Sequence, residues 1–201
     1  MAGLLLIRHG QTEWSSARRH TGRTDVPLAP EGEDQARALR PLFTERPLSR
    51  VLVSPLQRAV RTAELAGLET SGTDADLMEW DYGGYEGRTT ADVQQERPGW
   101  YIWRDGVVPG DADHPGEGVE HVGARADRVL ERLGPVLDNP DAADAAVVAH
   151  GHLLRVLTAR RLGLPADCGA LFRLETAGTA RLGWEHGRPV LTDWNALPQR
   201  E

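Results

Sequence analysis

Three short, continuously apolar runs stand out along the chain, and each ends at a polar or glycine-containing turn. The runs are Gly3–Ile7, Val51–Val53 and Val147–Ala149. Continuous apolar runs of this length are typical of strands buried on both faces, as in a parallel sheet. We therefore expect these segments to form the centre of a sheet.

Between these runs, apolar residues recur at the spacing of amphipathic helices. The expected helices are Glu31 to about Glu45, about Leu56–Ala66, Thr90–Arg97, Val119–Leu137 and Leu153–Leu162. Pro41 predicts a kink or an early end in the first helix. Ser54 and Pro55 suit the start of the second, as cap and first-turn residues.

Short strands are also expected near the C-terminus, over Leu171–Glu175, Ala180–Trp184 and Val190–Thr192. Strands that alternate with helices predict an α/β layered sheet. The turn-rich residues 21–30, 77–88 and 110–118 are expected to be loops. A chain of 201 residues fits a single domain, in which about 80–118 forms a small cap region.

The composition is typical of a soluble globular protein, with 26% charged and 40% hydrophobic residues. The formal net charge is −7, and every basic side chain is an arginine. An acidic chain without a basic run is a poor nucleic-acid binder. The apolar N-terminal run is too short for a signal peptide or a membrane span, so we expect a cytoplasmic protein without nucleic-acid or membrane partners.

The oligomeric state and the redox chemistry are less constrained. An exposed apolar strand edge is compatible with a homodimer, although no feature of the sequence demands one. Cys168 is the single cysteine, which excludes an internal disulfide and a thiolate metal cluster.

Candidate chemistry gathers where the apolar runs end. Arg8, His9 and Gly10 follow the first run, and His150 and Gly151 follow the third. Arg58 lies about one helical turn beyond the second run. Ligands of open α/β sheets bind beyond the carboxyl ends of the strands, so we expect these residues to meet at one edge. Arginine, histidine and helix N-termini together favour a phosphate ligand, and the two glycines let the backbone approach it.

Such a pocket can support covalent catalysis. A neutral histidine is a competent nucleophile toward phosphorus when a hydrogen bond holds its other ring nitrogen. The second histidine, protonated, would stabilise charge on the phosphoryl oxygens. Glu79 is the candidate general acid, because aromatic and apolar neighbours favour a protonated carboxyl. Asp81 and Glu86 are alternatives.

Each signal is weak alone. An isolated His150 is more often a hydrogen-bonded histidine at the edge of the core, and an isolated Arg58 a surface charge. His150 and His152 are close in sequence, but no pattern here matches known metal-ligand spacings, so we expect no metal. Tryptophans can line a pocket or form a cluster beneath the loops; the candidates are Trp14, Trp80, Trp100 and Trp103.

Five ordered motifs together resemble the histidine phosphatase superfamily, in its phosphoglycerate-mutase-like branch. The motifs are Arg8–Thr12, Thr21–Asp25, Ser54–Ala63, Glu79–Gly83 and Ala149–Gly151. The resemblance implies a three-layer α/β/α sandwich with a mostly parallel central sheet, and neither cofactor nor metal. It implies His9 as the phosphorylated nucleophile and Glu79 as the proton donor. The implied phosphate pocket consists of Arg8, Arg58 and His150, and further substrate contacts are expected from Gly10, Ser15, Thr21, Gly22, Tyr82, Arg104 and Gly151.

Three departures from the family pattern bear on the activity. Ser15 stands where the family often has Asn, and residues 116–118 read Gly-Glu-Gly in place of Gly-Glu-Ser. Arg104 is followed by Asp105, where a mutase is expected to carry two arginines for a carboxylate. The sequence therefore predicts a phosphomonoesterase that acts on small phosphorylated metabolites. A broad substrate specificity is compatible with this prediction. Among the family members, the chain most resembles the acid phosphatases and sugar bisphosphatases. The alternatives are a cofactor-dependent phosphoglycerate mutase and a non-catalytic module that binds phosphorylated ligands.

Overall fold

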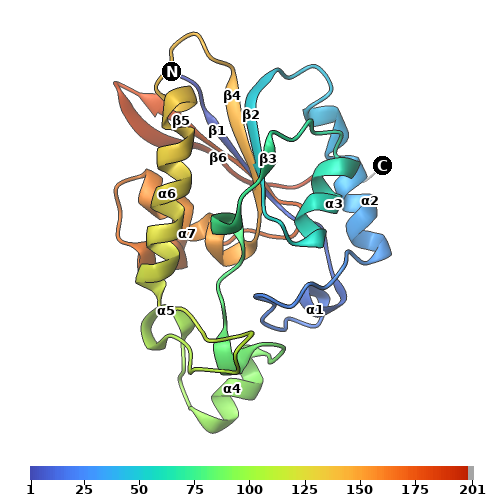
Figure 1. The fold of residues 1–201 in the computed structure, drawn as a ribbon, viewed down its shortest axis with the longest axis vertical. Helices are drawn as coiled ribbons and strands as arrows, with labels where there is room; N and C mark the ends of the chain where they lie inside the picture. The colour runs from blue at the N-terminus through green and yellow to red at the C-terminus, as the bar shows by residue number, and fades with distance from the viewer. Residues whose placement is uncertain (199–201) are drawn as a thin grey trace.

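The computed structural model describes residues 1–198 and shows a mixed α/β fold built on one six-stranded sheet (Figure 1). The strand order is β3-β2-β4-β1-β5-β6. The strands are β1 (Leu4–Arg8), β2 (Leu48–Val53), β3 (Gly72–Thr73), β4 (Asp144–Ala149), β5 (Thr179–Glu185) and β6 (Arg188–Ala196). The pairs formed among β1 to β4 are parallel, whereas β5 runs antiparallel to both of its neighbours. The mostly parallel sheet expected from the sequence is confirmed.

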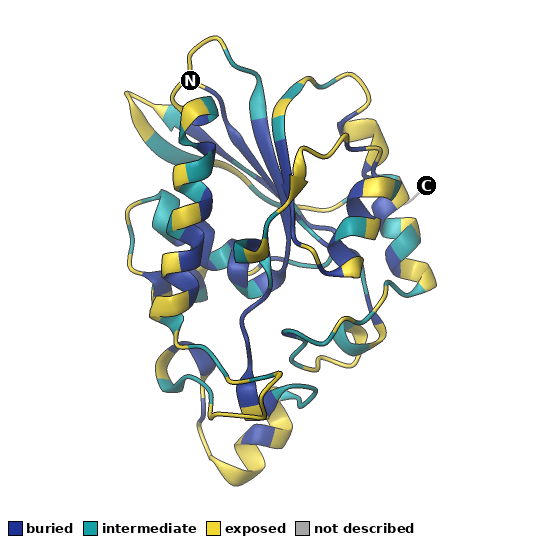
Figure 2. Cartoon of the chain, in the orientation of Figure 1, coloured by how far each residue is buried: buried dark blue, intermediate teal, exposed yellow. Residues whose placement is uncertain are grey.

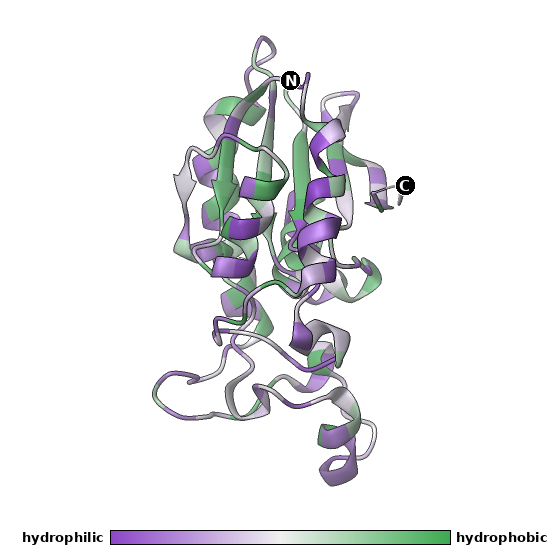
Figure 3. Cartoon of the chain, turned by 90° about the vertical axis from the view of Figure 1, so that its right-hand side faces the viewer, coloured by the Kyte–Doolittle hydropathy of each residue, from purple (hydrophilic) through white to green (hydrophobic). Residues whose placement is uncertain are grey.

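Helices cover both faces of this sheet (Figure 1). The long helices are α2 (Pro30–Ala38), α3 (Gln57–Leu65), α6 (Val119–Leu137) and α7 (Gly151–Arg161). Successive side chains of a strand point to opposite faces, so Leu4 and Leu6 join the core under α6 and α7, while Leu5 and Ile7 join the core under α2 and α3. The central strands are dark blue, or buried, along most of their length in Figure 2. The hydropathy view in Figure 3 shows green, apolar strands between helices that carry purple, hydrophilic stretches.

The structure tests the expected end of the first helix and the expected start of the second. The first helix ends at Ala38, before Pro41, and the chain continues as the 3-10 turn η1 (Arg40–Leu42), so the early end is confirmed. The expected cap on the second helix is wrong. Leu56 is the N-cap of α3, and the Gln57 amide donates instead to Asp25 Oδ1 at 2.8 Å.

The strand expected over Leu171–Glu175 does not form. The 3-10 helix η4 (Ala166–Leu171) occupies its start, and side chains satisfy the backbone groups that follow. The Leu174 carbonyl accepts a hydrogen bond from Arg8, and the Glu175 amide donates to Asn195. The two other C-terminal strands form as β5 and β6, and β6 is longer than expected.

Residues 80–118 contain only short helices and connecting segments. The remaining short helices of the chain are α1 (Glu13–Ser16), η2 (Ala75–Leu77), η3 (Gly83–Tyr85), α4 (Thr90–Glu96) and α5 (Ile102–Asp105). Helices α4 and α5 lie below the sheet in Figure 1, on the side of its carboxyl ends. Trp80, Trp100 and Trp103 are buried in the core that also packs under α6 and α7, so these tryptophans form a structural cluster. Among the described residues, no helix combines the length and hydrophobicity needed to span a membrane.

Candidate active site

The two histidines that end apolar strands lie next to each other. Strands β1 and β4 pair in parallel with Arg8 opposite Ala149, and His9 and His150 are the residues that follow. Their ring centroids are 5.1 Å apart, and both side chains are buried. The sheet register alone therefore brings the two imidazoles into one site.

His9 has the tautomer that an attacking imidazole needs. Its Nδ1 lies 2.7 Å from the Gly10 carbonyl oxygen. A carbonyl only accepts hydrogen bonds, so Nδ1 carries the proton, and Nε2 keeps its lone pair without a partner among residues 1–198. Burial, together with the nearby cations Arg58 and Arg8, holds the pKa of His9 well below its usual value. The ring is therefore neutral near pH 7.

The turn that holds His9 is fixed by both neighbouring helices. Thr62 of α3 accepts a hydrogen bond from the Gly10 amide at 3.1 Å. A Cβ on Gly10 would come within 2.2 Å of the Gly32 carbonyl oxygen in α2, so only glycine fits there. Neither Thr62 nor Gly32 was expected from the sequence, because both reach the site only through packing of α2 and α3.

His150 is also neutral, but both of its nitrogens are occupied. Its Nδ1 accepts from Arg58 Nε at 3.2 Å, since a guanidinium can only donate. Its Nε2 therefore carries the proton and donates to Ser54 Oγ at 2.7 Å. Burial and Arg58 hold the pKa of His150 well below its usual value. The expected positive charge on His150 is wrong for this arrangement, and the charge beside the ring belongs to Arg58.

Arg58 is fully buried and holds the loop that follows α1. Its terminal nitrogens donate to the carbonyls of Thr21, Gly22 and Thr24 at 2.9–3.2 Å. Glu86 accepts the amides of Gly22 and Thr24 from the other side. Arg58 thus supports His150 and this loop. The sequence predicted that Arg58 binds phosphate directly, but Arg58 does not line the cavity over His9.

A cavity of about 660 Å³ opens over His9. The sequence-predicted residues among its walls are Arg8, His9, Ser15, Thr21, Glu79, Tyr82 and Gly151. Its charged lining consists of five arginines and two glutamates, namely Arg8, Arg18, Arg19, Arg155, Arg173, Glu79 and Glu175. This excess of guanidinium groups suits a ligand with several anionic oxygens.

Arg8 supplies a half-buried cation at the base of the cavity. One terminal nitrogen donates to the Leu174 carbonyl at 2.6 Å, while the buried Nε–H has no acceptor among the described residues. Gly151, the first residue of α7, lies flat against this group, since a Cβ there would be 3.2 Å from Arg8 Cζ. Arg155, one turn further along α7, is held by the carbonyls of Gly169 and Ala170 at 2.9 Å.

Glu79 lies at the N-terminus of α7. Its carboxylate accepts backbone N–H groups from Trp80, His152 and Leu153 at 2.9–3.0 Å. Its aromatic neighbours Trp80 and Tyr82 are buried as expected, but three backbone donors that the sequence did not reveal also surround the carboxylate. Helix α7 orients the carboxylate at the wall of the cavity.

The alternative acids are engaged elsewhere. Asp81 accepts the Gly83 amide at 2.9 Å, and Glu86 holds the loop at residues 22–24. Neither belongs to the cavity lining, so Glu79 is the one of these three acids that faces the cavity.

Arg104 lies outside the cavity, contrary to the expected substrate contact. Its exposed guanidinium pairs with Asp105 at 2.8 Å and donates to the Gly99 carbonyl. The acid that follows Arg104 in the sequence thus neutralises it in the structure.

Buried Tyr82 and half-buried His152 form a neutral pair at the cavity wall. The Tyr82 hydroxyl lies 2.5 Å from His152 Nδ1. Burial raises the pKa of Tyr82 well above its usual value and lowers the pKa of His152 well below it, so the hydroxyl donates to the ring. Sequence reasoning considered His152 only as a metal ligand. Among residues 1–198, no group of three or more His, Cys, Asp or Glu side chains is arranged to hold a metal.

A family model described as the histidine phosphatase superfamily (branch 1) matches residues 4–197. The chain belongs to this superfamily. The match covers all five motifs, so the resemblance seen in the sequence is confirmed.

Three curated relatives carry different activities in their names. An acid phosphatase from Mycobacterium tuberculosis is 39% identical, over 92% of this histidine phosphatase and 87% of the relative. Sedoheptulose 1,7-bisphosphatase from Saccharomyces cerevisiae is 34% identical, over 80% of this chain and 67% of the relative. A probable phosphoglycerate mutase GpmB from Salmonella choleraesuis is 31% identical, over 96% and 90%.

Solved structures agree on the fold. A functionally characterised open reading frame from Mycobacterium tuberculosis superposes with a TM-score of 0.87 at 36% identity, covering 98% of this chain and 99% of the other. A mycobacterial glucosyl-3-phosphoglycerate phosphatase superposes with a TM-score of 0.82 at 30% identity, covering 98% and 100%. The three-layer fold expected from the sequence is thus that of solved histidine phosphatases.

Proposed function

We propose that this protein hydrolyses phosphomonoesters of small metabolites through a phosphohistidine at His9. The observation that carries the proposal is the hydrogen bond from His9 Nδ1 to the Gly10 carbonyl, at the base of an arginine-lined cavity. It leaves Nε2 as an unprotonated nucleophile in a site built for anionic oxygens. The phosphatase names of several relatives support the same reaction class.

The reaction takes two steps. In the first, Glu79 takes up a proton as the anionic substrate binds, His9 Nε2 attacks phosphorus, the ester P–O bond breaks, and Glu79 gives this proton to the leaving oxygen. In the second, the Glu79 carboxylate takes a proton from water as the water oxygen attacks the phosphohistidine, which releases phosphate and neutral His9. Arg8 and the Gly151 N–H at the start of α7 stabilise the charge on the phosphoryl oxygens.

The substrate is a small phosphorylated molecule, and residues 80–118 act as the cap that selects its leaving group. The five arginines around the cavity favour substrates with more than one anionic group. A cytoplasmic location is part of the proposal, and a chain with a single cysteine, which cannot form an internal disulfide, suits it. Neither metal nor cofactor takes part in the proposed steps. A homodimer is a further expectation, which light scattering would test.

Phosphate release from an alkyl ester such as glycerol phosphate, whose departing oxygen needs a proton, tests the reaction when it is measured with a chelator present. We expect His9→Ala to abolish turnover and to remove an acid-labile phosphoryl label that the wild type acquires from substrate. Glu79→Gln should slow turnover by about 10²–10⁴-fold, as is typical for loss of a general acid. Wild-type turnover by His9→Ala would disprove the mechanism, and an unaffected Glu79→Gln would exclude Glu79 as the acid.

The mutase alternative has one supporting observation, the relative named as a probable phosphoglycerate mutase. The pairing of Arg104 with Asp105 argues against it, because this arginine is neutralised outside the cavity. Interconversion of 2- and 3-phosphoglycerate after priming with the bisphosphate would favour the mutase. Phosphate binding without any phosphate release would instead favour a non-catalytic binding module.

A further inference from the structure

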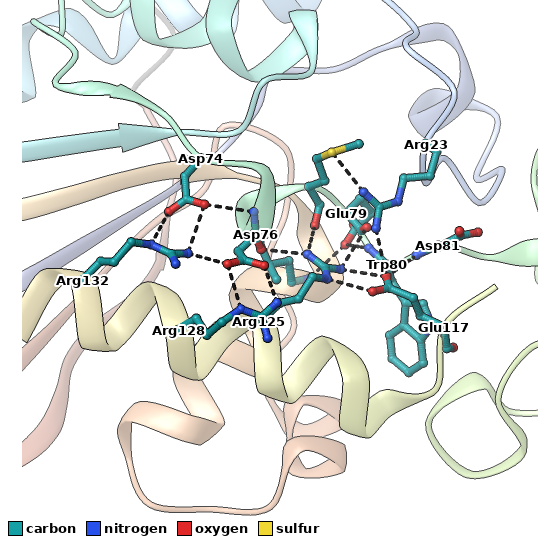
Figure 4. Close-up of polar contacts among 12 residues, drawn as sticks. Arg23, Asp74, Asp76, Glu79, Trp80, Asp81, Glu117, Arg125, Arg128 and Arg132 are labelled. Atoms are coloured by element: carbon teal, nitrogen blue, oxygen red, sulfur yellow. Dashed lines mark hydrogen bonds and ion pairs between the residues drawn. The ribbon is translucent and has the colours of Figure 1, made fainter. Parts of the chain in front are cut away.

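Arg125, in the first half of α6, uses every N–H that an arginine has (Figure 4). Nε and one hydrogen of NH2 bind the two carboxylate oxygens of Glu117, each at 2.8 Å. NH1 donates to the carbonyls of Asp76 and Met78 at 2.7 Å. The last hydrogen reaches the Glu79 carbonyl at 3.2 Å. One buried cation thus holds three carbonyls of the segment that carries Glu79.

Glu117 holds the same segment just beyond Glu79. Its carboxylate accepts the Asp81 amide at 3.0 Å, and its own amide donates to the Asp81 carbonyl at 3.0 Å. Its carbonyl accepts the indole N–H of Trp80 at 2.8 Å. Arg125 and Glu117, here called the Arg125–Glu117 clamp, therefore fix the main chain on both sides of Glu79.

The clamp is an ion pair in a mostly buried setting. Arg125 is only 7% exposed. Burial opposes the ionisation of Glu117, but the hydrogen bonds and charge of Arg125 outweigh it, so the pKa of Glu117 lies below its usual value. A charged pair with its donors satisfied, anchored in a 19-residue helix, is a rigid support for a neighbouring segment.

Two other arginines of α6 provide a contrast. Arg128 and Arg132 lie one and two turns beyond Arg125 and are more exposed. They bind the carboxylates of Asp74 and Asp76, as the left side of Figure 4 shows. Their hydrogen bonds reach only the Asp74 and Asp76 side chains. They therefore stabilise the 3-10 turn η2 and do not bind the main chain on either side of Glu79.

We propose that Arg125 and Glu117 are positioning residues for Glu79, which set where its carboxyl meets the leaving oxygen. The inference rests on the proposed role of Glu79 as the acid. The backbone of Glu79 is held by α6 through the clamp, and its carboxylate by the N–H groups of α7. Displacement of a reacting group by about 1 Å can cost about 10²-fold in rate, so loosening the backbone grip should be visible in catalysis.

The test compares leaving groups. An alkyl phosphate such as glycerol phosphate needs a proton on its departing oxygen, whereas 4-nitrophenolate leaves without one. We expect Glu117→Gln and Arg125→Lys to lower kcat/KM for the alkyl ester by about 10–100-fold. The same variants should lower it for the nitrophenyl ester by only about 3-fold or less, because that ester depends little on general acid catalysis. The value of kcat/KM is used because it excludes the hydrolysis of the phosphohistidine.

Arg128→Met is the matched control on the same helix, and it should change both esters by less than about 2-fold, since exposed ion pairs contribute little. Equal losses on both esters in Glu117→Gln and Arg125→Lys would show a merely structural role and overturn the proposal. If Arg125→Lys fails to fold, the isosteric Glu117→Gln decides alone. Retention of activity by His9→Ala would instead overturn the proposed function, so the two failures are distinguishable.

Discussion

At the scale of single residues, hydrogen-bond partners separate two histidines that occupy equivalent places in neighbouring strands. His9 Nδ1 donates to the Gly10 carbonyl, and no described residue binds His9 Nε2. Both ring nitrogens of His150 have partners, because Nδ1 accepts from Arg58 and Nε2 donates to Ser54. Burial alone would make both rings neutral, so the hydrogen-bond partners distinguish His9, the proposed nucleophile, from His150.

The position of the Gly10 carbonyl depends on a close backbone crossing, which gives a testable prediction. A Cβ on Gly32 would lie 2.0 Å from the Gln11 carbonyl oxygen. Gly32→Ala should therefore push α2 away from the turn, lower the free energy of unfolding by about 1–3 kcal/mol, and reduce turnover. Gly134→Ala is the control, because its nearest neighbour would be 3.8 Å away, and alanine should stabilise that helical position by up to about 1 kcal/mol. Urea unfolding measures both, and equal stability of the two variants would contradict the crossing.

The residues to which we assign the chemistry could be singled out from the sequence, but the residues that support them could not. His9, Arg8 and Glu79 follow local patterns, such as an apolar strand that ends in a charged turn. Ser54 and Thr62 are ordinary hydroxyl residues whose partners lie 96 and 52 positions away. Only the packing of strands and helices creates those pairs, so no local pattern marks them.

At the scale of elements, Glu79 joins two parts of the fold. It accepts the amides of His152 and Leu153 in the first turn of α7, as a capping carboxylate does. We expect Glu79→Gln to lower the free energy of unfolding by about 0.5–2 kcal/mol, because the amide has only one acceptor oxygen and no charge. This loss is separate from the loss of turnover.

The matched control for the α7 cap is Glu120→Gln in the first turn of α6. Glu120 is exposed and accepts no capping hydrogen bond, so its replacement tests the helix dipole alone and should cost about 0.3 kcal/mol or less in salt. Chemical denaturation of both variants measures the difference. A Glu79→Gln protein as stable as the wild type would mean that α7 gains nothing from this cap.

The elements themselves follow the sequence pattern where burial decides them. Continuous apolar runs predicted the buried strands, and Pro41 predicted the early end of α2. The expected strand at Leu171–Glu175 failed because Arg8 and Asn195 capture its backbone groups. A pattern of apolar residues reports burial, and it cannot report which distant side chain will satisfy a carbonyl.

At the scale of the whole molecule, charge is distributed unevenly. The chain carries a net charge of −7, yet five arginines face two glutamates around the cavity. Composition alone would suggest a protein that repels anions. The cavity is nevertheless locally cationic, because the fold brings Arg8 of β1 and Arg155 of α7 to the same edge of the sheet.

Four histidines with lowered pKa values make the stability of the whole molecule depend on pH. The pKa values of His9, His150 and His152 are lowered well below 6.5 by burial, and that of His20 is lowered to about 4. Below pH 6.5 the unfolded chain therefore binds protons that the folded protein refuses. By linkage, each such histidine lowers the free energy of unfolding by about 1.4 kcal/mol per pH unit as the pH falls. Acidic groups with lowered pKa values, such as Glu117, add losses only below about pH 4.5, so the window from 6.5 to 5 isolates the histidines.

Urea unfolding in phosphate-free buffer at pH 7.5, 6.5 and 5.5 tests this dependence on the histidines. We expect little change between the first two values and a marked loss of stability between the last two. His20→Gln should reduce the slope below pH 6.5 by about one proton, whereas His121→Gln, at an exposed position of α6, should leave it unchanged. A stability that stays flat down to pH 5.5 would mean that the folded protein accepts these protons, and the neutral His9 required for attack on phosphorus would then lose its support.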